Sequence, residues 1–132
     1  MNQLKPNDIN VFDVVNYLIC RLDTSLYGLT NYKMNQLLYY IQGHYIAKYD
    51  QPLFPEALEA TIFGPIVPIV FGTFFEFALK FIPNDYFCQE ARKQPLSDEA
   101  KTIIQKVIDE YARLGVYDLR VRIWQEYVVP FS

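Results

Sequence analysis

The side chains best suited to chemistry are few and lie far apart along the chain. The sequence holds one histidine, His44, and two cysteines, Cys20 and Cys88. General acid–base and nucleophilic catalysis need a titratable group held close to a second reacting group. The sequence places neither cysteine nor any serine near His44. We therefore predict no catalytic residue and no enzyme, and we interpret His44 as a helix-surface or partly buried residue.

The acidic residues show no clear catalytic or metal-binding spacing. Glu56 and Glu59 lie close together in a proline-bounded loop, and Asp109 precedes Glu110 in a helical pattern. Neighbouring carboxylates on exposed elements are common, whereas a catalytic pair needs an apolar enclosure. One histidine and two separated cysteines give no recognised ligand pattern, and five isolated glycines form no phosphate-binding loop. We predict no metal and no cofactor.

The two cysteines also bear on the compartment. Cys20 and Cys88 form no CxxC motif, and Cys20 lies among apolar residues. Buried free thiols are therefore favoured over a disulfide, which fits a reducing compartment.

One cluster combines basic and aromatic residues near the C terminus. Arg120 and Trp124 are four residues apart and share a helix face, with Arg122 between them. Such a cluster is typical of single-strand nucleic-acid binding, and this is our alternative hypothesis of function: a nucleic-acid-binding regulatory protein of a phage or its host. The net charge of −3 lacks the basic excess that phosphate binding requires. Nucleic acid is accordingly disfavoured as a partner.

Composition indicates one folded domain, residues 1–132. Hydrophobic residues make up 52% of the sequence and charged residues 20%, which argues against disorder and leaves apolar side chains for a binding surface. The first ten residues are polar and include Pro6, and we find no apolar run long enough to span a membrane. We expect a cytoplasmic protein with no membrane contact.

Apolar spacing predicts two helices in the first half. The first begins at Val11 after a cap at either Asn7 or Asp8, and it ends by Ser25 to Gly28. The second runs from Asn31 to about Tyr49 after an N-cap at Thr30.

The middle of the chain is interrupted by prolines. Glu59 to Phe63 is expected to be either a strand or an extended loop. A third helix, Ile69 to about Phe81, is apolar almost all round and is expected to be central or covered. Residues 83–95 are polar and irregular, which predicts a mobile surface loop.

The second half carries two more predicted helices. The clearer one follows an N-cap at Ser97 and stops by Gly115, and a short one runs from a cap at Asp118 to about Glu126. An apolar tail, residues 128–132, follows. Together these segments predict a mainly α, compact bundle of about five helices, with either a short β-hairpin or an extended segment near residues 58–64.

Two blocks of sequence resemble one known family. Residues 29–54 read LTNYKMNQLLYYIQGHYIAKYDQPLF, and residues 59–71 read EATIFGPIVPIVF. These are similar to the two signature blocks of the Panacea-domain antitoxins, which include SocA-like and phage-associated GepA-like proteins; their usual forms are K-L-Q-K-L-L-Y-Y-A-Q-G with a P-L-F turn, and E-A-W-x-x-G-P-V-V-P-x-V-Y. The residues of the first block that match are Lys33, Leu37, Leu38, Tyr39, Tyr40, Gln42, Gly43, Pro52, Leu53 and Phe54.

The chain also departs from the family pattern. Asn35 and Gln36 stand where Gln and Lys are usual, and Thr61 replaces a Trp. Near the end R-I-W-Q-E stands where the family often shows T-H-Q-E, so Trp124 occupies the position of a His.

The resemblance implies a toxin-neutralising antitoxin of a bacterial or phage-borne pair. It would bind a cognate protein toxin directly, in a chaperone-like or protease-adaptor-like role with a protease or chaperone as a further partner. The oligomeric state stays open. We expect the partner to be bound by the polar side of the second helix, the proline-bounded loop and the C-terminal motif. The residues are Asn35, Gln36, Tyr39, Thr61, Phe63, Gly64, Pro65, Gln125 and Glu126.

Overall fold

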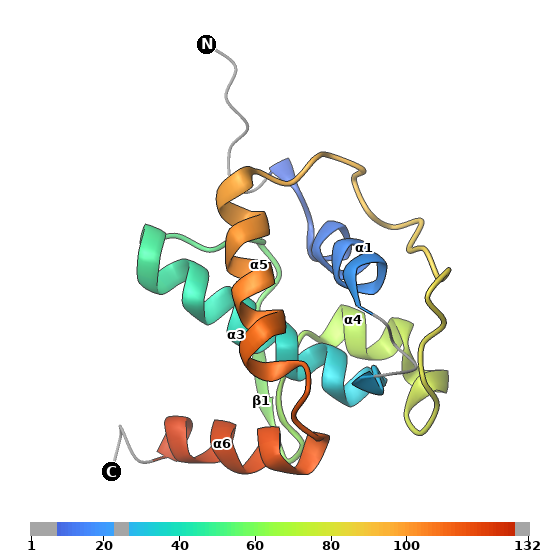
Figure 1. Ribbon diagram of the computed structural model, residues 1–132, viewed down its shortest axis with the longest axis vertical. Coiled ribbons are helices and arrows are strands. Elements are labelled where there is room, and N and C mark those ends of the chain that lie inside the picture. The colour runs from blue at the N-terminus through green and yellow to red at the C-terminus, as the bar shows by residue number, and fades with distance from the viewer. Residues whose placement is uncertain (1–7, 23–26, 129–132) are drawn as a thin grey trace.

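The computed structural model describes residues 8–22 and 27–128. Within these ranges the protein is mainly α, as the sequence predicted, and a small two-stranded antiparallel sheet is present where either a β-hairpin or an extended segment was expected (Figure 1). The elements are α1 (Val11–Arg21), α3 (Asn31–Tyr49), β1 (Glu59–Thr61), β2 (Gly64–Ile66), α4 (Pro68–Thr73), a 3₁₀ turn (Phe75–Phe77), α5 (Asp98–Tyr111) and α6 (Val116–Val128). No helix in the described part is long and apolar enough to cross a membrane.

Helix α3 is the centre of the fold and contacts α5, β2, α6 and α4. It begins where the sequence predicted, because the Thr30 hydroxyl accepts a hydrogen bond from the Lys33 amide. It ends at Asp50, whose φ of 57° reverses the chain. A helix covered on several sides needs no single apolar stripe, and α3 also buries polar side chains. These are Asn31, Lys33, Asn35, Gln36 and Gln42.

Three of these buried amides hold backbone from elsewhere in the chain. Gln42 donates to the Phe54 carbonyl at 2.9 Å and accepts from the Leu53 amide at 2.8 Å. Asn35 Oδ1 accepts from the amide of Val67 at 2.9 Å. Asn31 Nδ2 donates to a carbonyl of α4, also at 2.9 Å. Because a buried backbone group without a partner is costly, these bonds fix where the turn after α3 and the hairpin must lie.

Lys33 joins α3 to the end of α5. Its side chain is buried, and Nζ donates to the carbonyls of Tyr27, Ala112 and Leu114, at 3.3 Å and 2.6 Å for the first two. Burial lowers the pKa of this ammonium group. The carbonyls at the end of a helix lack helical partners and carry partial negative charge, so the cation satisfies and stabilises the α5 terminus.

Helix α1 is capped by Asn10, and its first turn holds the long connection before α5. Asn10 and Asp13 form a capping box, and Asp13 also accepts from the Lys93 amide at 2.8 Å. Asn16 exchanges two hydrogen bonds with the backbone of Cys88. The loop predicted to be mobile is therefore tied to α1 by side-chain-to-backbone bonds, and it runs beside α1 along one edge of the molecule (Figure 1).

The third predicted helix is the largest error in the sequence interpretation. The helix stops at Thr73, whose hydroxyl donates to the Ile69 carbonyl, and a 3₁₀ turn follows. The segment is not covered: Ile69 is 53% exposed, Phe75 70% and Leu79 93%. Apolar residues on all sides of so short a helix cannot all face one core, and only some, such as Phe74, are buried.

Smaller corrections concern termini and one cysteine. The cap of α1 is Asn10 and not Asp8, while the other candidate, Asn7, lies outside the described residues. The predicted stop at residues 25–28 falls partly outside them too, although Gly28 does take a φ of 65°. Helix α6 begins at Val116, so Asp118 lies in its first turn and does not cap it. Most of the predicted apolar tail, residues 129–132, is outside the described part.

Cys20 is exposed, against the prediction of a buried thiol, whereas Cys88 is buried. The buried stripe of α1 passes through Leu18, Ile19 and Leu22, and Cys20 points away from it. Burial raises the pKa of the Cys88 thiol to about 12, so this thiol stays protonated and inert at neutral pH.

Candidate functional site

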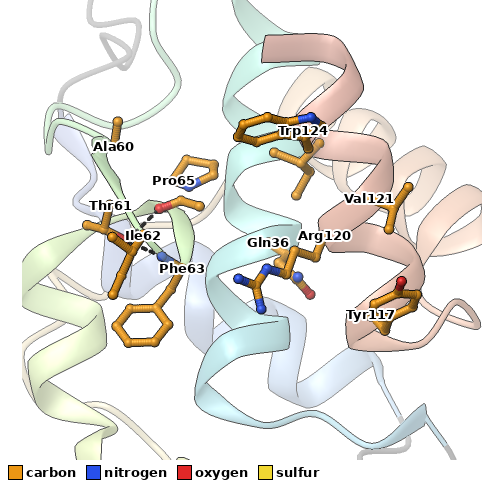
Figure 2. Close-up of a pocket in the computed structure, with 12 residues that line it drawn as sticks. Gln36, Ala60, Thr61, Ile62, Phe63, Pro65, Tyr117, Arg120, Val121 and Trp124 are labelled. Atoms are coloured by element: carbon orange, nitrogen blue, oxygen red, sulfur yellow. Dashed lines mark hydrogen bonds between the residues drawn. The ribbon is translucent and has the colours of Figure 1, made fainter. Parts of the chain in front are cut away.

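An apolar groove of about 580 Å³ separates the β-hairpin from α6. Figure 2 shows the hairpin on one side, α6 on the other and α3 behind them. The groove is wide enough for several side chains or a small ligand, since typical ligand pockets are roughly 300–1,000 Å³. Its lining is mainly hydrocarbon. The lining residues are Gln36, Ala60, Thr61, Ile62, Phe63, Gly64, Pro65, Tyr117, Arg120, Val121, Ile123 and Trp124.

The hairpin wall is built around a tight turn. Thr61 pairs with Gly64, and the Thr61 hydroxyl donates to the Gly64 carbonyl at 2.8 Å while it accepts from the Phe63 amide at 3.0 Å. Gly64 takes a φ of 96°, which a residue with a Cβ adopts only under strain. Gly64 is also the first residue of β2, and buried Pro65 follows it.

The hairpin is anchored at two points, one at its base and one at its turn. At the end of β2, the Val67 amide binds Asn35 of α3. At the turn, the Phe63 ring lies 5.6 Å from Tyr32 and 6.4 Å from Phe71, between ring centroids. Ile62, which is 83% exposed, therefore projects from a turn that is held in place.

The opposite wall is one face of α6. Leu119 and Ile123 are buried against the body of the protein, and Gln36 Nε2 donates to the Val116 carbonyl at 3.0 Å, which positions the start of the helix. Arg120 and Trp124 extend from α6 toward the hairpin (Figure 2). The indole is 66% exposed.

Charge in the groove is concentrated in one group. Arg120 has no hydrogen-bond or ion-pair partner among the residues that the structure describes. Arg122, two residues on, instead lies over the Tyr111 ring, with its guanidinium carbon 5.7 Å from the ring centroid. The groove thus offers one unneutralised guanidinium beside apolar walls.

A tyrosine stack connects α3, α5 and α6 outside the groove. The rings of Tyr40 and Tyr111 lie parallel, 3.8 Å between centroids, and Tyr39 meets Tyr40 edge-on at 5.0 Å. Burial, followed by the nearby Glu126 carboxylate, raises the pKa of the Tyr40 hydroxyl. His44 Nε2 is 3.4 Å from the Tyr111 hydroxyl, so the single histidine belongs to this packing.

The predicted contact residues fall into two groups. Five line the groove: Gln36, Thr61, Phe63, Gly64 and Pro65. Asn35, Tyr39, Gln125 and Glu126 do not line it. Asn35 is 1% exposed and is used to hold the hairpin, so the expected polar face of this helix is in fact turned inward.

The α6 wall was not predicted as a protein-binding surface. Sequence reasoning did place Arg120 and Trp124 on one helix face, but it connected them with nucleic acid. Tyr117, Val121 and Trp124 recur at spacings of four and three residues, and this spacing was the available signal. It could not indicate that the hairpin, some 60 residues earlier, would form the other wall.

The remaining candidate chemistry is dispersed. Glu56 Oε1 accepts from the Val11 amide at the start of α1, and Glu59 lies exposed on β1. Asp109 accepts from Gln105 within α5. Among the described residues, no three His, Cys, Asp or Glu side chains are grouped to hold a metal ion.

These features define a small helical domain with an open, mostly apolar binding groove. Residues 34–126 match the family model described as "Antitoxin SocA-like, Panacea domain", and the chain belongs to this family. The matched range includes both groove walls and all but the first three residues of α3 beneath them. No curated protein and no solved structure matches the chain.

Proposed function

We propose that this protein is the antitoxin of a bacterial or phage-borne toxin–antitoxin pair and that it neutralises a cognate protein toxin by direct binding. Membership of the SocA-like antitoxin family supports an antitoxin role. The observation that carries the binding mode is the groove, because one of its walls is made from the G-P signature block. In this proposal the protein binds the toxin in the cytoplasm.

The chemistry of the groove suits protein recognition. Trp, Tyr and Arg are the residue types that contribute most to binding energy at protein interfaces, and all three stand on the α6 wall. Exposed Ile62, Val121 and Trp124 supply apolar area that an occupant would bury. No catalytic step is part of the proposal, and transfer of the bound toxin to a protease or chaperone is an extension of it.

Co-expression with the product of the neighbouring gene tests the function. That product should arrest growth alone, and the wild-type chain should restore growth and co-purify with it. Val121→Glu, which places a charge in the groove, should abolish rescue, whereas Lys101→Glu on the exposed side of α5 should not. A neighbouring product that is harmless alone, or that stays toxic and unbound, would refute the proposal.

Nucleic-acid binding is a second candidate because Arg120, Arg122 and Trp124 are all exposed on α6. Base stacking on Trp124 would explain the exposed indole. Binding of single-stranded oligonucleotides should then fall steeply with added salt. No mobility shift at low salt would remove this candidate.

Substitution of His44 tests whether the protein acts without catalysis. A His44→Ala variant should keep full toxin neutralisation, because the imidazole contacts the tyrosine stack and not the groove. Loss of neutralisation in a variant that remains folded would reopen a catalytic role.

A further inference from the structure

Arg120 is exposed and has no hydrogen-bond or ion-pair partner among the described residues. It lines a groove whose other walls are mainly Ile, Val, Pro, Phe and Trp side chains. Arginine remains ionised at any relevant pH, and its guanidinium presents a planar fork that matches a carboxylate in two parallel hydrogen bonds. Among the described residues no carboxylate occupies that fork.

We propose that the groove receives an apolar segment of the partner protein that carries one carboxylate, and that this carboxylate pairs with Arg120 while apolar neighbours pack between Ile62 and Trp124. The inference rests on the proposed function and adds the chemistry of the partner segment. Charge complementarity carries it: a single cation beside apolar walls favours a largely apolar occupant with one anionic group.

A second polar feature lies on the floor of the groove. Gln36 is 5% exposed, and while its Nε2 binds the Val116 carbonyl, its Oε1 has no hydrogen-bond partner in the described part of the chain. A buried acceptor without a partner destabilises the folded state. A segment that separates the hairpin from α6 and brings a donor N–H to this oxygen would offset part of that destabilisation.

The same features argue against a nucleic-acid strand as the occupant. Backbone tracking needs several cations along the path, but Arg120 is the one cation among the groove-lining residues, and Arg122 lies over Tyr111. The protein as a whole carries a net charge of −3, which repels a polyanion.

Charge reversal with complementation tests the proposal. The probe is the purified product of the neighbouring toxin gene. Arg120→Glu should weaken its binding at least tenfold, and Arg122→Glu should weaken it less than threefold, because that guanidinium points to the tyrosine stack. Circular dichroism spectra of both variants should match the wild type, since both side chains are exposed. The thermal midpoint should be unchanged in Arg120→Glu and slightly lower in Arg122→Glu, which loses the contact over Tyr111.

The decisive step uses the partner. Each Asp and Glu of the toxin is changed to Arg in turn, and each variant is tested against Arg120→Glu. One reversal that restores neutralisation identifies the paired carboxylate. Unchanged toxin binding by Arg120→Glu, or failure of every reversal to restore it, overturns the proposal.

Other occupants give different results. A dimer in sedimentation analysis that Arg120→Glu dissociates would assign the groove to a second copy. Binding of a single-stranded oligonucleotide that depends on Arg120 would assign it to nucleic acid. Both results overturn the proposal. If the wild-type chain neutralises the toxin and Arg120→Glu does so equally well, the antitoxin function stands and the carboxylate pairing fails.

Discussion

Tyr40 carries a buried hydroxyl without a hydrogen-bond partner in the described part of the chain. The ring itself is well placed, stacked on Tyr111 across the α3–α5 contact. We predict that Tyr40→Phe keeps this stack and raises the free energy of unfolding by up to about 1–3 kcal/mol, because it removes the desolvation cost of the hydroxyl. Urea denaturation at pH 7 measures the difference.

The same substitution should change the alkaline limb of the stability profile. Burial raises the pKa of Tyr40 above its unfolded value of 10.0. Above that pH the unfolded chain releases the Tyr40 proton while the folded protein retains it. The free energy of unfolding is therefore unaffected by this group below about pH 10 and falls as the pH rises further. Tyr40→Phe should lose stability less steeply in this range.

Tyr111→Phe is the matched control, since the Tyr111 hydroxyl does have a partner in His44. That variant should lose about 0.5–1.5 kcal/mol, the usual net value of one hydrogen bond. If Tyr40→Phe is instead destabilised by a similar amount, its hydroxyl is bonded in solution and Glu126 is the candidate acceptor.

At the scale of elements, buried amides of α3 set the position of the hairpin. Asn35 Oδ1 holds the Val67 amide at the point where β2 ends. Asn35→Ala should cost about 1–3 kcal/mol, because a buried N–H is left without an acceptor. The Val67 amide should also exchange hydrogen faster, and affinity for the proposed toxin should fall as the groove wall loosens.

Asn16→Ala provides the control for this prediction. Asn16 makes the same kind of bond to the backbone of Cys88, at a site apart from the groove. It should destabilise the protein to a similar extent and leave toxin affinity unchanged. Equal loss of affinity in both variants would show that Asn35 acts through global stability and not through the hairpin.

Much of the fold could be predicted from local signals. Thr30 and Ser97 cap the helices they were expected to cap, since a hydroxyl before a periodic segment acts within one turn. The helical class was also predicted and is confirmed, and of the two alternatives near residues 58–64 the structure shows the β-hairpin, which spans residues 59–66. Lys33 shows the limit of this reasoning, because the carbonyls it binds lie some 80 residues away.

The candidate site was predicted in part for the same reason. Thr61, Phe63, Gly64 and Pro65 form a local turn, so the sequence could mark them as a group. Their opposition to Arg120 and Trp124 depends on α6 packing across α3, which is a long-range arrangement that no local pattern contains. The prediction that the whole chain forms one domain stays a prediction.

At the scale of the molecule, stability should be distributed unevenly. Helix α3 lies at the centre, whereas α6 lies at one end and contacts α3 and β2 (Figure 1). Among its described side chains, Leu119 and Ile123 are the buried apolar ones. Elements with few buried contacts open locally, at a lower free energy than global unfolding.

Native-state hydrogen exchange should therefore separate these two helices. Amides of α3 should exchange at the free energy of global unfolding, and amides of α6 by a smaller opening with weaker dependence on urea. Leu119→Ala should lower the opening free energy of α6 by about 2–5 kcal/mol. If the wild-type opening free energy is smaller than this, the variant helix should show no protection. Identical exchange free energies in α3 and α6 would contradict the prediction. Binding of the proposed toxin should slow hydrogen exchange more in α6 and the hairpin than in α1, because α6 and the hairpin form the walls of the groove and α1 does not.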